Sequence, residues 1–505
     1  MQSLDTKKAV GIDGIPPLIL KLSSCIITKP LTKIINLCIK ESTFPSLAKI
    51  ASILPIFKKD DRSNKKNYRP ISILSSISKI FGKIIHKQIL EYIEHKLSPY
   101  ISAYRQGHST QHVLIRLIEE WKQALDNNKF VGAVLMDLLK AFDCIPHDLL
   151  IAKLDAYGFK SDSLKLIYSY LKGRRQCVKI NNTNSNFLTL LSGVPQGSIV
   201  GPLLFNIFIN DIFFIFDTAS LHGFAYDNTL SAQAGSVKEL ICILENESKK
   251  AIDWMNLNGM LVNSSKFQVM ILTKKKEHIV ETLKIDGNFI ISQKSVLLLG
   301  IEIDDKLKFK NHISELCKRA ANQLNSLYRF KSYLDEYSRR IAVFSFALSN
   351  FSYCPLVWHF CSAESNNKIE YLRKRAIKFI GTDTVCDKLK TSFKIKRLRL
   401  LALEIFKTIN NLNPSYINNI FKLSANRNSN RIGKNLIPQK VKQVTYGKKV
   451  YVFWDQFYGT HFLKILKKFQ IYQSFKDFIN KWGEPNCPFY EKFVRYCLSI
   501  EYNYY

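Results

Sequence analysis

Two aspartates in this chain lie where their carboxylates could hold metal ions. Asp137 lies in GAVLMDL, an apolar run that predicts a buried strand, and Asp227 lies in SLHGFAYDNTLSA, whose flanks predict a hairpin. A strand-borne aspartate facing a hairpin-borne aspartate is a rigid way to place hard oxygen ligands. Such ligands suit two divalent ions, about 3.5–4 Å apart, that stabilise both ends of an in-line phosphoryl displacement. A lone aspartate at a strand end is more often a turn or cap residue, so the surrounding segments must decide.

The charge of the chain favours a polyanionic partner. Its 505 residues include 74 Lys and Arg against 41 Asp and Glu, a formal net charge of +33. Residues 301–505 alone contain 36 basic and 16 acidic side chains. A field of this sign raises the local concentration of nucleic acid and speeds its association. A solvated basic surface without a partner is the alternative, and at +33 we expect nucleic acid.

Cysteine usage and hydropathy indicate a reducing compartment and no membrane. The 11 cysteines show neither CxxC pairs nor regular spacing, which argues against a disulfide framework or a zinc finger. Cys354 and Cys361 are expected to be buried thiols. The longest apolar run, 203–216, is short for a membrane span and contains two asparagines and an aspartate, so it predicts buried core. We therefore expect a soluble protein of the nucleus and cytoplasm.

The order of predicted elements divides the chain into four regions. Residues 1–50 are a Gly/Pro-punctuated lead-in to an apolar helix. Strands, hairpins and helices alternate over 51–305. Periodic apolar and basic residues predict a helical domain over 306–385, and a basic C-terminal region of helices with Asn/Ser-rich breaks follows over 386–505.

Seven segments, in one collinear order, resemble the reverse transcriptase domain of non-LTR retrotransposons, most closely the jockey and CR1-like elements. They are ILPIFKKDDRSNKKNYRPISIL, SAYRQGHST, MDLLKAFDCIPHDLL, SGVPQGSIVGPLLFNIFINDI, FAYDNTL, LVNSSKFQVMIL and LLLGIEID. SYCPLVWHF, RKRAIKFIG and YGKKVYVFW also resemble that family's C-terminal region, so the resemblance covers nearly the whole chain. It implies an α+β right-hand polymerase fold with fingers, an antiparallel-sheet palm and a helical thumb, followed by an extra, mostly helical C-terminal region.

The activity implied by the resemblance is RNA-directed DNA synthesis. Asp137 and Asp227 match the catalytic, metal-binding aspartates, with Mg²⁺ or Mn²⁺ as the cofactor. The implied partners are an RNA template, a DNA primer and deoxynucleoside triphosphates. The oligomeric state stays open.

Basic residues of the expected fingers match a triphosphate site. Lys58, Lys59 and Arg69 lie where the family holds the phosphates of the incoming nucleotide. Arginine suits bidentate phosphate contacts and lysine supplies a point charge. Simple solvation of the two lysines is the alternative.

Four further residues match positions around the nucleotide. Phe142 lies where an aromatic ring would clash with a 2′-hydroxyl and so select deoxynucleotides, although a core phenylalanine fits the same packing. Gln196 matches a glutamine that touches the nucleotide, and Gly197 lets the backbone approach closely. Lys266 matches a lysine near the leaving pyrophosphate, although the next residue is Phe267 where the family usually has threonine.

Two other segments carry weaker matches. Tyr104 and Arg105 match an aromatic–arginine pair near the template, and LLLGIEID resembles the hairpin that grips the primer.

One position departs from the family pattern at the centre of the site. The family's hairpin reads F/Y-A-D-D, and this chain has Phe224, Ala225, Tyr226 and Asp227. The missing first aspartate is the direct metal ligand in the family, and a phenol, neutral at pH 7, cannot replace it. The loss costs on the order of 5 kcal/mol, roughly 10³–10⁴ in rate. We therefore expect impaired activity; the alternatives are a catalytically inactive, nucleic-acid-binding remnant and a translated pseudogene fragment.

Two further departures concern the ends of the chain. The chain begins close to the polymerase segments, so we expect it to contain no upstream endonuclease domain. The family's terminal Cys-rich segment keeps Cys487 and Cys497 without the cysteines between them, so we expect no zinc site there.

Overall fold

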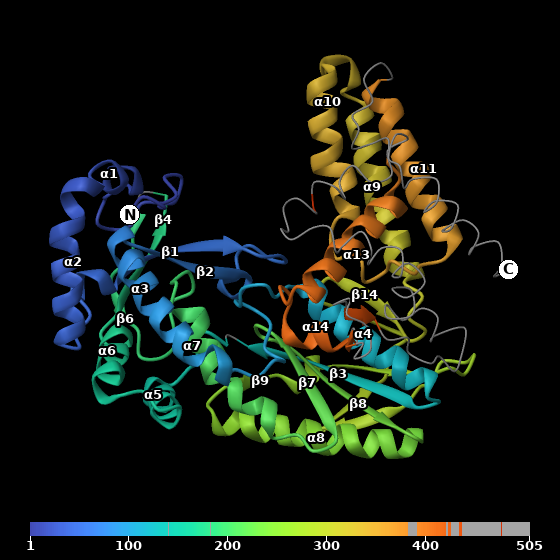
Figure 1. Ribbon diagram of the computed structural model, residues 1–505, viewed down its shortest axis with the longest axis horizontal. Helices are drawn as coiled ribbons and strands as arrows, with labels where there is room; N and C mark the ends of the chain where they lie inside the picture. The colour runs from blue at the N-terminus through green and yellow to red at the C-terminus, as the bar shows by residue number, and fades with distance from the viewer. Residues whose placement is uncertain are drawn as a thin grey trace.

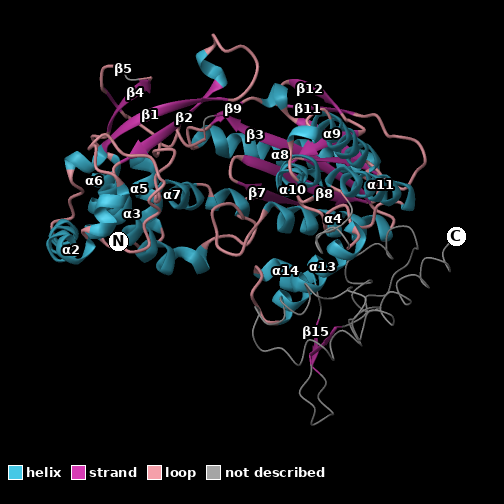
Figure 2. Ribbon diagram, turned by 90° about the horizontal axis from the view of Figure 1, so that it is seen from above, coloured by secondary structure: helices cyan, strands magenta, loops and turns pink. Residues whose placement is uncertain are grey.

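The computed structural model describes residues 1–420 apart from 140, 182 and 382–390, together with 423–425, 434–436 and 476. Figure 1 shows three bodies: a helix-and-sheet body that contains the N-terminus, a central sheet underlain by one long helix, and a group of helices that stands above that sheet. Figure 2 shows the same bodies from above. We call them the fingers, the palm and the thumb.

The fingers are built on a five-stranded sheet of order β2-β1-β4-β5, with β6 beside β4. The polar turn between β1 and β2 closes an antiparallel hairpin, whereas β1 and β4 pair in parallel across a long connection. The strands are β1 (Ile50–Phe57), β2 (Tyr68–Leu74), β4 (Arg175–Ile180), β5 (Thr183–Asn184) and β6 (Leu188–Thr189). The helices near them are α1 (Pro17–Leu22), α2 (Ser24–Lys40), α3 (Ser76–Ile93), α5 (His147–Ala156), α6 (Ser161–Leu171) and α7 (Gly201–Phe208).

The palm sheet has the order β10-β3-β8-β7, and the short β9 pairs with the end of β3. All these pairings are antiparallel. Side chains alternate along β3, so Val131 and Ala133 face the core that includes α4, while Val134 and Met136 face the core that includes α8. Burial on both faces explains the apolar run of this strand. The strands are β3 (Phe130–Leu139), β7 (Ala219–Phe224), β8 (Asp227–Ala234), β9 (Leu261–Val262) and β10 (Gln268–Leu272), and the helices are α4 (Thr110–Asp126) and α8 (Val237–Leu257).

Helix α8 packs closely on β3 because position 132 is glycine. A Cβ on Gly132 would clash with the side chain of Leu244. The helix begins in a capping box: the Ser236 hydroxyl accepts from the Glu239 amide at 3.2 Å, and the Glu239 carboxylate accepts from the Gly235 amide at 3.2 Å. The cap fixes where the helix starts, and the glycine fixes how near it lies to the sheet.

Two hairpins connect the palm to the thumb. They are β11 (Thr282–Ile285) with β12 (Asn288–Ile291), and β13 (Ser295–Leu298) with β14 (Ile301–Asp304). The second is LLLGIEID, and its turn residues Leu299 and Gly300 have φ of 47° and 79°. Glycine adopts such a φ readily, whereas leucine does so at a cost.

The thumb helices share one core with α4. Ile313, Trp358 and Leu372 belong to it, and so does Phe406, so this core continues past residue 385. Cys354 is buried here, as expected, and Cys361 is partly buried. The helices are α9 (Lys310–Tyr328), α10 (Glu336–Ala342), α11 (Ala363–Ile380), α13 (Phe393–Ile409) and α14 (Ser415–Ile420), and a short hairpin of β15 (Leu423–Ala425) and β16 (Lys434–Leu436) follows.

Two further expectations from the sequence concern membrane spans and the C-terminal segments. Across the part of the chain that the structure describes, no helix is both long and apolar enough to cross a membrane. The expectations for Cys487, Cys497 and YGKKVYVFW fall outside the described residues.

Candidate active site

The two aspartates lie opposite each other at one end of the palm sheet. Asp137 near the end of β3 is the register partner of Asp227 at the start of β8. Side chains of directly opposed residues lie on the same face of a sheet, with their Cβ atoms about 5 Å apart. The side chain of Asp137 is exposed and that of Asp227 is partly buried. The geometry expected for a pair of metal-binding carboxylates is therefore present.

The two carboxylates repel each other. Burial raises the pKa of Asp227 to about 6, and the negative charge of Asp137 contributes to the same shift. Partial burial also raises the pKa of Asp137, while the positive charges of Lys266 and Lys58 lower it. A cation bound between the two aspartates would relieve this repulsion, so the pair fits a divalent ion.

The site contains two opposed carboxylates, those of Asp137 and Asp227. Among the described residues, the structure contains no group of three or more His, Cys, Asp or Glu side chains arranged to hold a metal. The residue before Asp227, at position 226, is a tyrosine and adds no carboxylate to the pair.

Tyr226 occupies the turn of the catalytic hairpin without disturbing it. The turn residue before it, Ala225, has a left-handed φ of 58°. The Tyr226 carbonyl accepts from the Leu138 amide at 3.3 Å, which continues the pairing of β3 with β8. Its ring is partly buried against the core beneath the palm, and its hydroxyl accepts a hydrogen bond from Nη2 of Arg69 at 3.3 Å. The hairpin therefore pairs with β3 up to its turn, where Arg69 contacts the Tyr226 hydroxyl.

The expected triphosphate residues lie on the fingers hairpin. Arg69 on β2 is the register partner of Ile56 on β1. Lys58 and Lys59 follow β1, and both side chains are exposed. Lys58 lies near enough to Asp137 to lower the pKa of that carboxyl. The hairpin thus brings positive charge toward the aspartates.

An aromatic group borders the site on the palm side. Phe142 is 9% exposed and stacks on Phe205, with ring centroids 4.7 Å apart. The ring of Tyr104 meets Phe142 edge-on at 5.9 Å. Phe142 is therefore a core residue that reaches the edge of the site, which fits both interpretations drawn from the sequence.

The VPQGS loop joins the palm to the fingers. The Gln196 carbonyl accepts from the Ser72 amide of β2 at 2.7 Å, and Nε2 of Gln196 donates to Asp143 at 3.2 Å. Gly197 has φ of 109°, and a Cβ there would lie 2.7 Å from the Ser72 carbonyl oxygen. Only glycine fits this approach, as the sequence indicates.

Lys266 lies beside the aspartates on a short helical turn between β9 and β10. Its ammonium is exposed and lowers the pKa of Asp137. The next residue, Phe267, is 4% exposed and belongs to the core beneath the palm. The unusual phenylalanine anchors the turn that carries the lysine.

A tyrosine that the sequence did not single out approaches the site from the thumb. The Tyr353 hydroxyl donates to the Leu299 carbonyl in the turn of the β13–β14 hairpin at 2.7 Å. Burial raises the pKa of this phenol, and the nearby charge of Asp227 contributes. Tyr353 lies within SYCPLVWHF, a segment matched to the family without a role for this residue.

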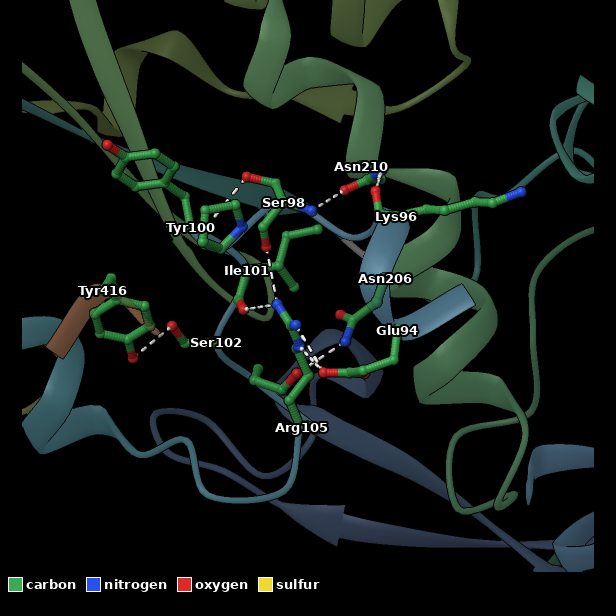
Figure 3. Close-up of polar contacts among 12 residues, drawn as sticks. Glu94, Lys96, Ser98, Tyr100, Ile101, Ser102, Arg105, Asn206, Asn210 and Tyr416 are labelled. Atoms are coloured by element: carbon green, nitrogen blue, oxygen red, sulfur yellow. Dashed lines mark hydrogen bonds and ion pairs between the residues drawn. The ribbon is translucent and has the colours of Figure 1, made fainter. Parts of the chain in front are cut away.

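Arg105 does not reach the site, although it was expected near the template together with Tyr104. Its side chain is 8% exposed and pairs with Glu94, with Nη2 at 2.7 Å from the carboxylate. It also donates to the carbonyls of Ser98 and Ile101, at 2.8 and 3.0 Å (Figure 3). Every contact that it makes here holds its own loop together.

Comparisons with known proteins agree with this geometry. Residues 56–303 match the family described as "Reverse transcriptase (RNA-dependent DNA polymerase)". The "Probable RNA-directed DNA polymerase from transposon BS" of Drosophila melanogaster is 28% identical over 394 residues, which are 75% of this chain and 43% of that protein. The "RNA-directed DNA polymerase from mobile element jockey" of Drosophila funebris is 26% identical over 330 residues, 63% of this chain and 35% of that protein. The chain thus spans less than half the length of these relatives.

A solved structure of apo telomerase from Candida tropicalis shows a weak likeness. The TM-score is 0.37 at 10% identity, with 74% of this chain and 70% of that chain covered. A likeness of this size carries no argument here.

The antiparallel palm sheet, the fingers and the helical thumb together define a polymerase of the right-hand class. Within that class, residues 56–303 are similar to the reverse transcriptases of non-LTR retrotransposons related to jockey.

Proposed function

We propose that this chain is the RNA-directed DNA polymerase part of a non-LTR retrotransposon, and that Tyr226 makes its DNA synthesis slow. The observation that supports this most directly is the register of Asp137 opposite Asp227, next to the hairpin turn that carries Tyr226. The partners would be an RNA template, a DNA primer and deoxynucleoside triphosphates. Such a protein would act in the nucleus and the cytoplasm.

Asp137 and Asp227 would hold the divalent ion, Mg²⁺ or Mn²⁺. When bound, such ions supply the positive charge that stabilises the phosphate oxygens during transfer. The mutual repulsion of the two carboxylates, which helps to raise the pKa of Asp227 to about 6, supports this assignment. Tyr226 offers a neutral hydroxyl where the family has a carboxylate, so one ligand charge is lost.

The nucleotide would lie between the fingers hairpin and the palm. Lys58, Lys59 and Arg69 would hold the triphosphate, and Lys266 would neutralise the leaving pyrophosphate. Their exposed side chains and the effects of Lys58 and Lys266 on Asp137 support this placement.

Palm residues would orient the sugar and base of the nucleotide. The Phe142 ring would select against a 2′-hydroxyl, and Gln196 would contact the nucleotide beside the close backbone approach at Gly197. The position of all three along the edge of the site, with Phe142 stacked on Phe205, supports these roles.

The domain division that accompanies this function has four parts. Residues 1–50 lead into the fingers and palm over 51–305, a thumb-like domain follows over 306–385, and 386–505 form a basic C-terminal region. The thumb would contact the duplex: a groove of about 560 Å³ between α9 and α11 is bordered by Lys318, Lys368 and Arg375.

A second candidate is a catalytically inactive protein that still binds nucleic acid. The hydrogen bond from Arg69 to the Tyr226 hydroxyl favours it, because it engages a side chain that would otherwise hold the triphosphate. With Tyr226 in place of an aspartate the net charge is still +33, so binding would persist.

Primer extension separates the two candidates. The purified chain is given an RNA template, a DNA primer, deoxynucleotides and Mg²⁺, and is compared with Tyr226→Asp. We expect both to bind the primer–template, and Tyr226→Asp to extend it roughly 10³-fold faster. Fast primer extension by the unaltered chain would contradict the proposal that Tyr226 slows DNA synthesis. If Tyr226→Asp does not extend the primer either, the second candidate, an inactive protein that binds nucleic acid, is favoured.

A further inference from the structure

Residues 97–109 form the loop that carries Tyr104 to the site. The side chain of Arg105, in the same loop, fixes the shape of this loop through hydrogen bonds. Arg105 donates to Glu94 through Nε and Nη2, at 3.0 and 2.7 Å, and through Nη1 to two carbonyls of the loop. Figure 3 shows the guanidinium surrounded by these acceptors. The loop therefore has a fixed shape on the C-terminal side of Tyr104.

The same loop is fastened to the catalytic hairpin. The Ser102 amide donates to the Gly223 carbonyl at 3.2 Å, and the Gly223 amide donates to the Tyr100 carbonyl at 3.2 Å. Gly223 lies on β7, three residues before Tyr226. On the other side, Nδ2 of Asn206 donates to the Ala103 carbonyl at 2.8 Å (Figure 3). The backbone is thus fixed immediately before Tyr104 as well.

Held on both sides, Tyr104 adopts a strained conformation that presents its ring to the site. Its φ is 60°, in the left-handed region, which is strained for a residue with a side chain. The ring is 50% exposed and meets Phe142 edge-on. Burial raises the pKa of the phenol, and the charges of Tyr226 and Asp227 contribute to the same shift.

A third attachment comes from the C-terminal region. The hydroxyl of Tyr416 on α14 lies 3.2 Å from the hydroxyl of Ser102, 314 residues away (Figure 3). Tyr416 is 7% exposed, and its ring lies under the guanidinium of Arg116, 4.3 Å from the centroid. The edge of His108, at the far end of the loop, meets the same ring at 5.6 Å.

Helix α14 is itself fastened to α4. Glu404 on α13 forms an ion pair with Nε2 of His112 at 3.1 Å, and Nδ2 of Asn413 donates to both the carbonyl and the carboxylate of Glu404. These contacts fix the position from which Tyr416 reaches the loop.

We propose that Tyr416 is a positioning residue for the polymerase site, which it serves by holding Ser102 and thereby the ring of Tyr104 against a nucleobase. The C-terminal region after residue 393 then supports the site as well as adding positive charge. This proposal rests on the proposed function for the nature of the site, and its test includes a measurement that needs no catalysis.

The test removes one hydroxyl at a time. Tyr416→Phe keeps the ring against Arg116 and removes only the hydrogen bond with Ser102, and Ser102→Ala removes the same hydrogen bond from the other side. In the Tyr226→Asp chain, we expect each change to raise the KM for the deoxynucleotide about three- to tenfold, the equivalent of one hydrogen bond, at an unchanged active fraction. Combined, the two changes should be no worse than either alone.

The fluorescence of a template base measures the position of the Tyr104 ring without requiring primer extension. 2-Aminopurine in the RNA at the position that pairs with the incoming nucleotide should be quenched by the ring of Tyr104 in the full-length chain. Tyr416→Phe and Ser102→Ala should each restore part of the emission. In a Tyr104→Ala background, Tyr416→Phe should add nothing further. Tyr337→Phe, an exposed tyrosine on α10, is the matched control and should change neither quantity.

Each possible result supports or overturns the role of Tyr416. Unchanged KM and emission in folded Tyr416→Phe overturn the proposal, and so do additive effects of Tyr416→Phe and Ser102→Ala. If Tyr416→Phe does not fold, Ser102→Ala takes its place in both measurements. If Tyr226→Asp does not extend a primer, the proposed function fails, and the emission measurement on the bound primer–template still supports or overturns the role of Tyr416.

Discussion

Polar side chains gather at two places on the palm, and the two groups differ in how their charges are satisfied. At the open end of the sheet, Asp137 and Asp227 face each other as like charges, and the pKa of Asp227 rises to about 6. Behind β7, Arg116 donates to Nδ1 of His222 at 2.6 Å, with its guanidinium between the rings of Tyr100 and Tyr416.

The polar side chains of the buried group pair with one another, as in a cluster that stabilises the fold. Burial and the charge of Arg116 hold the pKa of His222 well below its usual range, so the imidazole is neutral and can accept from the arginine. Nearby, the Trp121 indole donates to the Ser231 hydroxyl at 2.8 Å. Buried polar groups need such partners, since an unpaired one costs free energy.

The difference shows which polar residues serve the fold and which serve the site. The aspartates repel each other in the free protein, and a bound cation would relieve that repulsion. The buried cluster stabilises the protein in every state. Variants of the two groups should therefore separate activity from stability.

Removal of one aspartate should give the largest effect. In the Tyr226→Asp chain, Asp137→Asn should lower primer extension by roughly 10³-fold or more, because a ligand charge is lost where phosphate charge develops. The denaturation midpoint in urea should not fall. The exposed Asp217→Asn is the control and should alter neither quantity. If Asp137→Asn also lowered the denaturation midpoint, the aspartate pair and the buried cluster would not differ in their effect on stability.

Removal of the buried arginine should give the opposite pattern. Methionine has a side chain of similar length to that of arginine but is apolar and cannot donate a hydrogen bond. Arg116→Met therefore leaves Nδ1 of His222 without its donor, so the free energy of unfolding should fall by about 3 kcal/mol. Urea denaturation measures it, with the exposed Arg329→Met as the control. A loss below about 0.5 kcal/mol, the usual range for surface changes, would show that the cluster does not stabilise the palm.

A pH series tests the repulsion itself. Asp227 binds its proton more tightly in the folded state than in the unfolded state, so the free energy of unfolding should fall as pH rises from about 3.8 to about 6. The fall should be about 1–2 kcal/mol after allowance for solvent screening. Asp227→Asn should lack it, and the difference between the two urea-denaturation curves isolates the effect. Parallel pH profiles for the two proteins would show that the aspartates do not destabilise the free palm.

Thumb charges should give the smallest effect. Lys318→Glu or Arg319→Glu should weaken primer–template binding modestly and make its salt dependence shallower, by about 0.9 in slope for each duplex phosphate that is no longer neutralised. Binding measured over a series of salt concentrations gives the slope. Lys249→Glu on α8 is the control, and a slope that stays the same in the thumb variants would remove α9 from the binding surface.

The sequence predicted the elements that depend on local pattern. The strand with Asp137 follows from its apolar run, and the hairpin with Asp227 follows from its strand-like flanks. The need for glycine at 197 also followed from the expected close approach of the backbone. These are features that neighbours in the chain determine.

Contacts between distant segments could not be predicted in this way. The parallel pairing of Ile50 with Arg175, the burial of Arg105 and the contact of Tyr416 with Ser102 depend on how whole elements pack. A periodic pattern indicates which side of an element is buried and leaves its partner open. Tyr353 was missed for the same reason, since its approach to Asp227 depends on the placement of the thumb.

The contact between Ser102 and Tyr416 also sets an order of events during synthesis of the protein. Ribosomes add about 5–20 residues per second, so Tyr416 is made about 15–60 s after Ser102. From the addition of Asp227 until that of Tyr416, a nascent chain contains Asp137, Tyr226 and Asp227 but lacks the residue that fastens the Tyr104 loop from the C-terminal side. A ribosome-bound chain truncated before residue 416 should therefore have a palm whose loop lacks this one attachment.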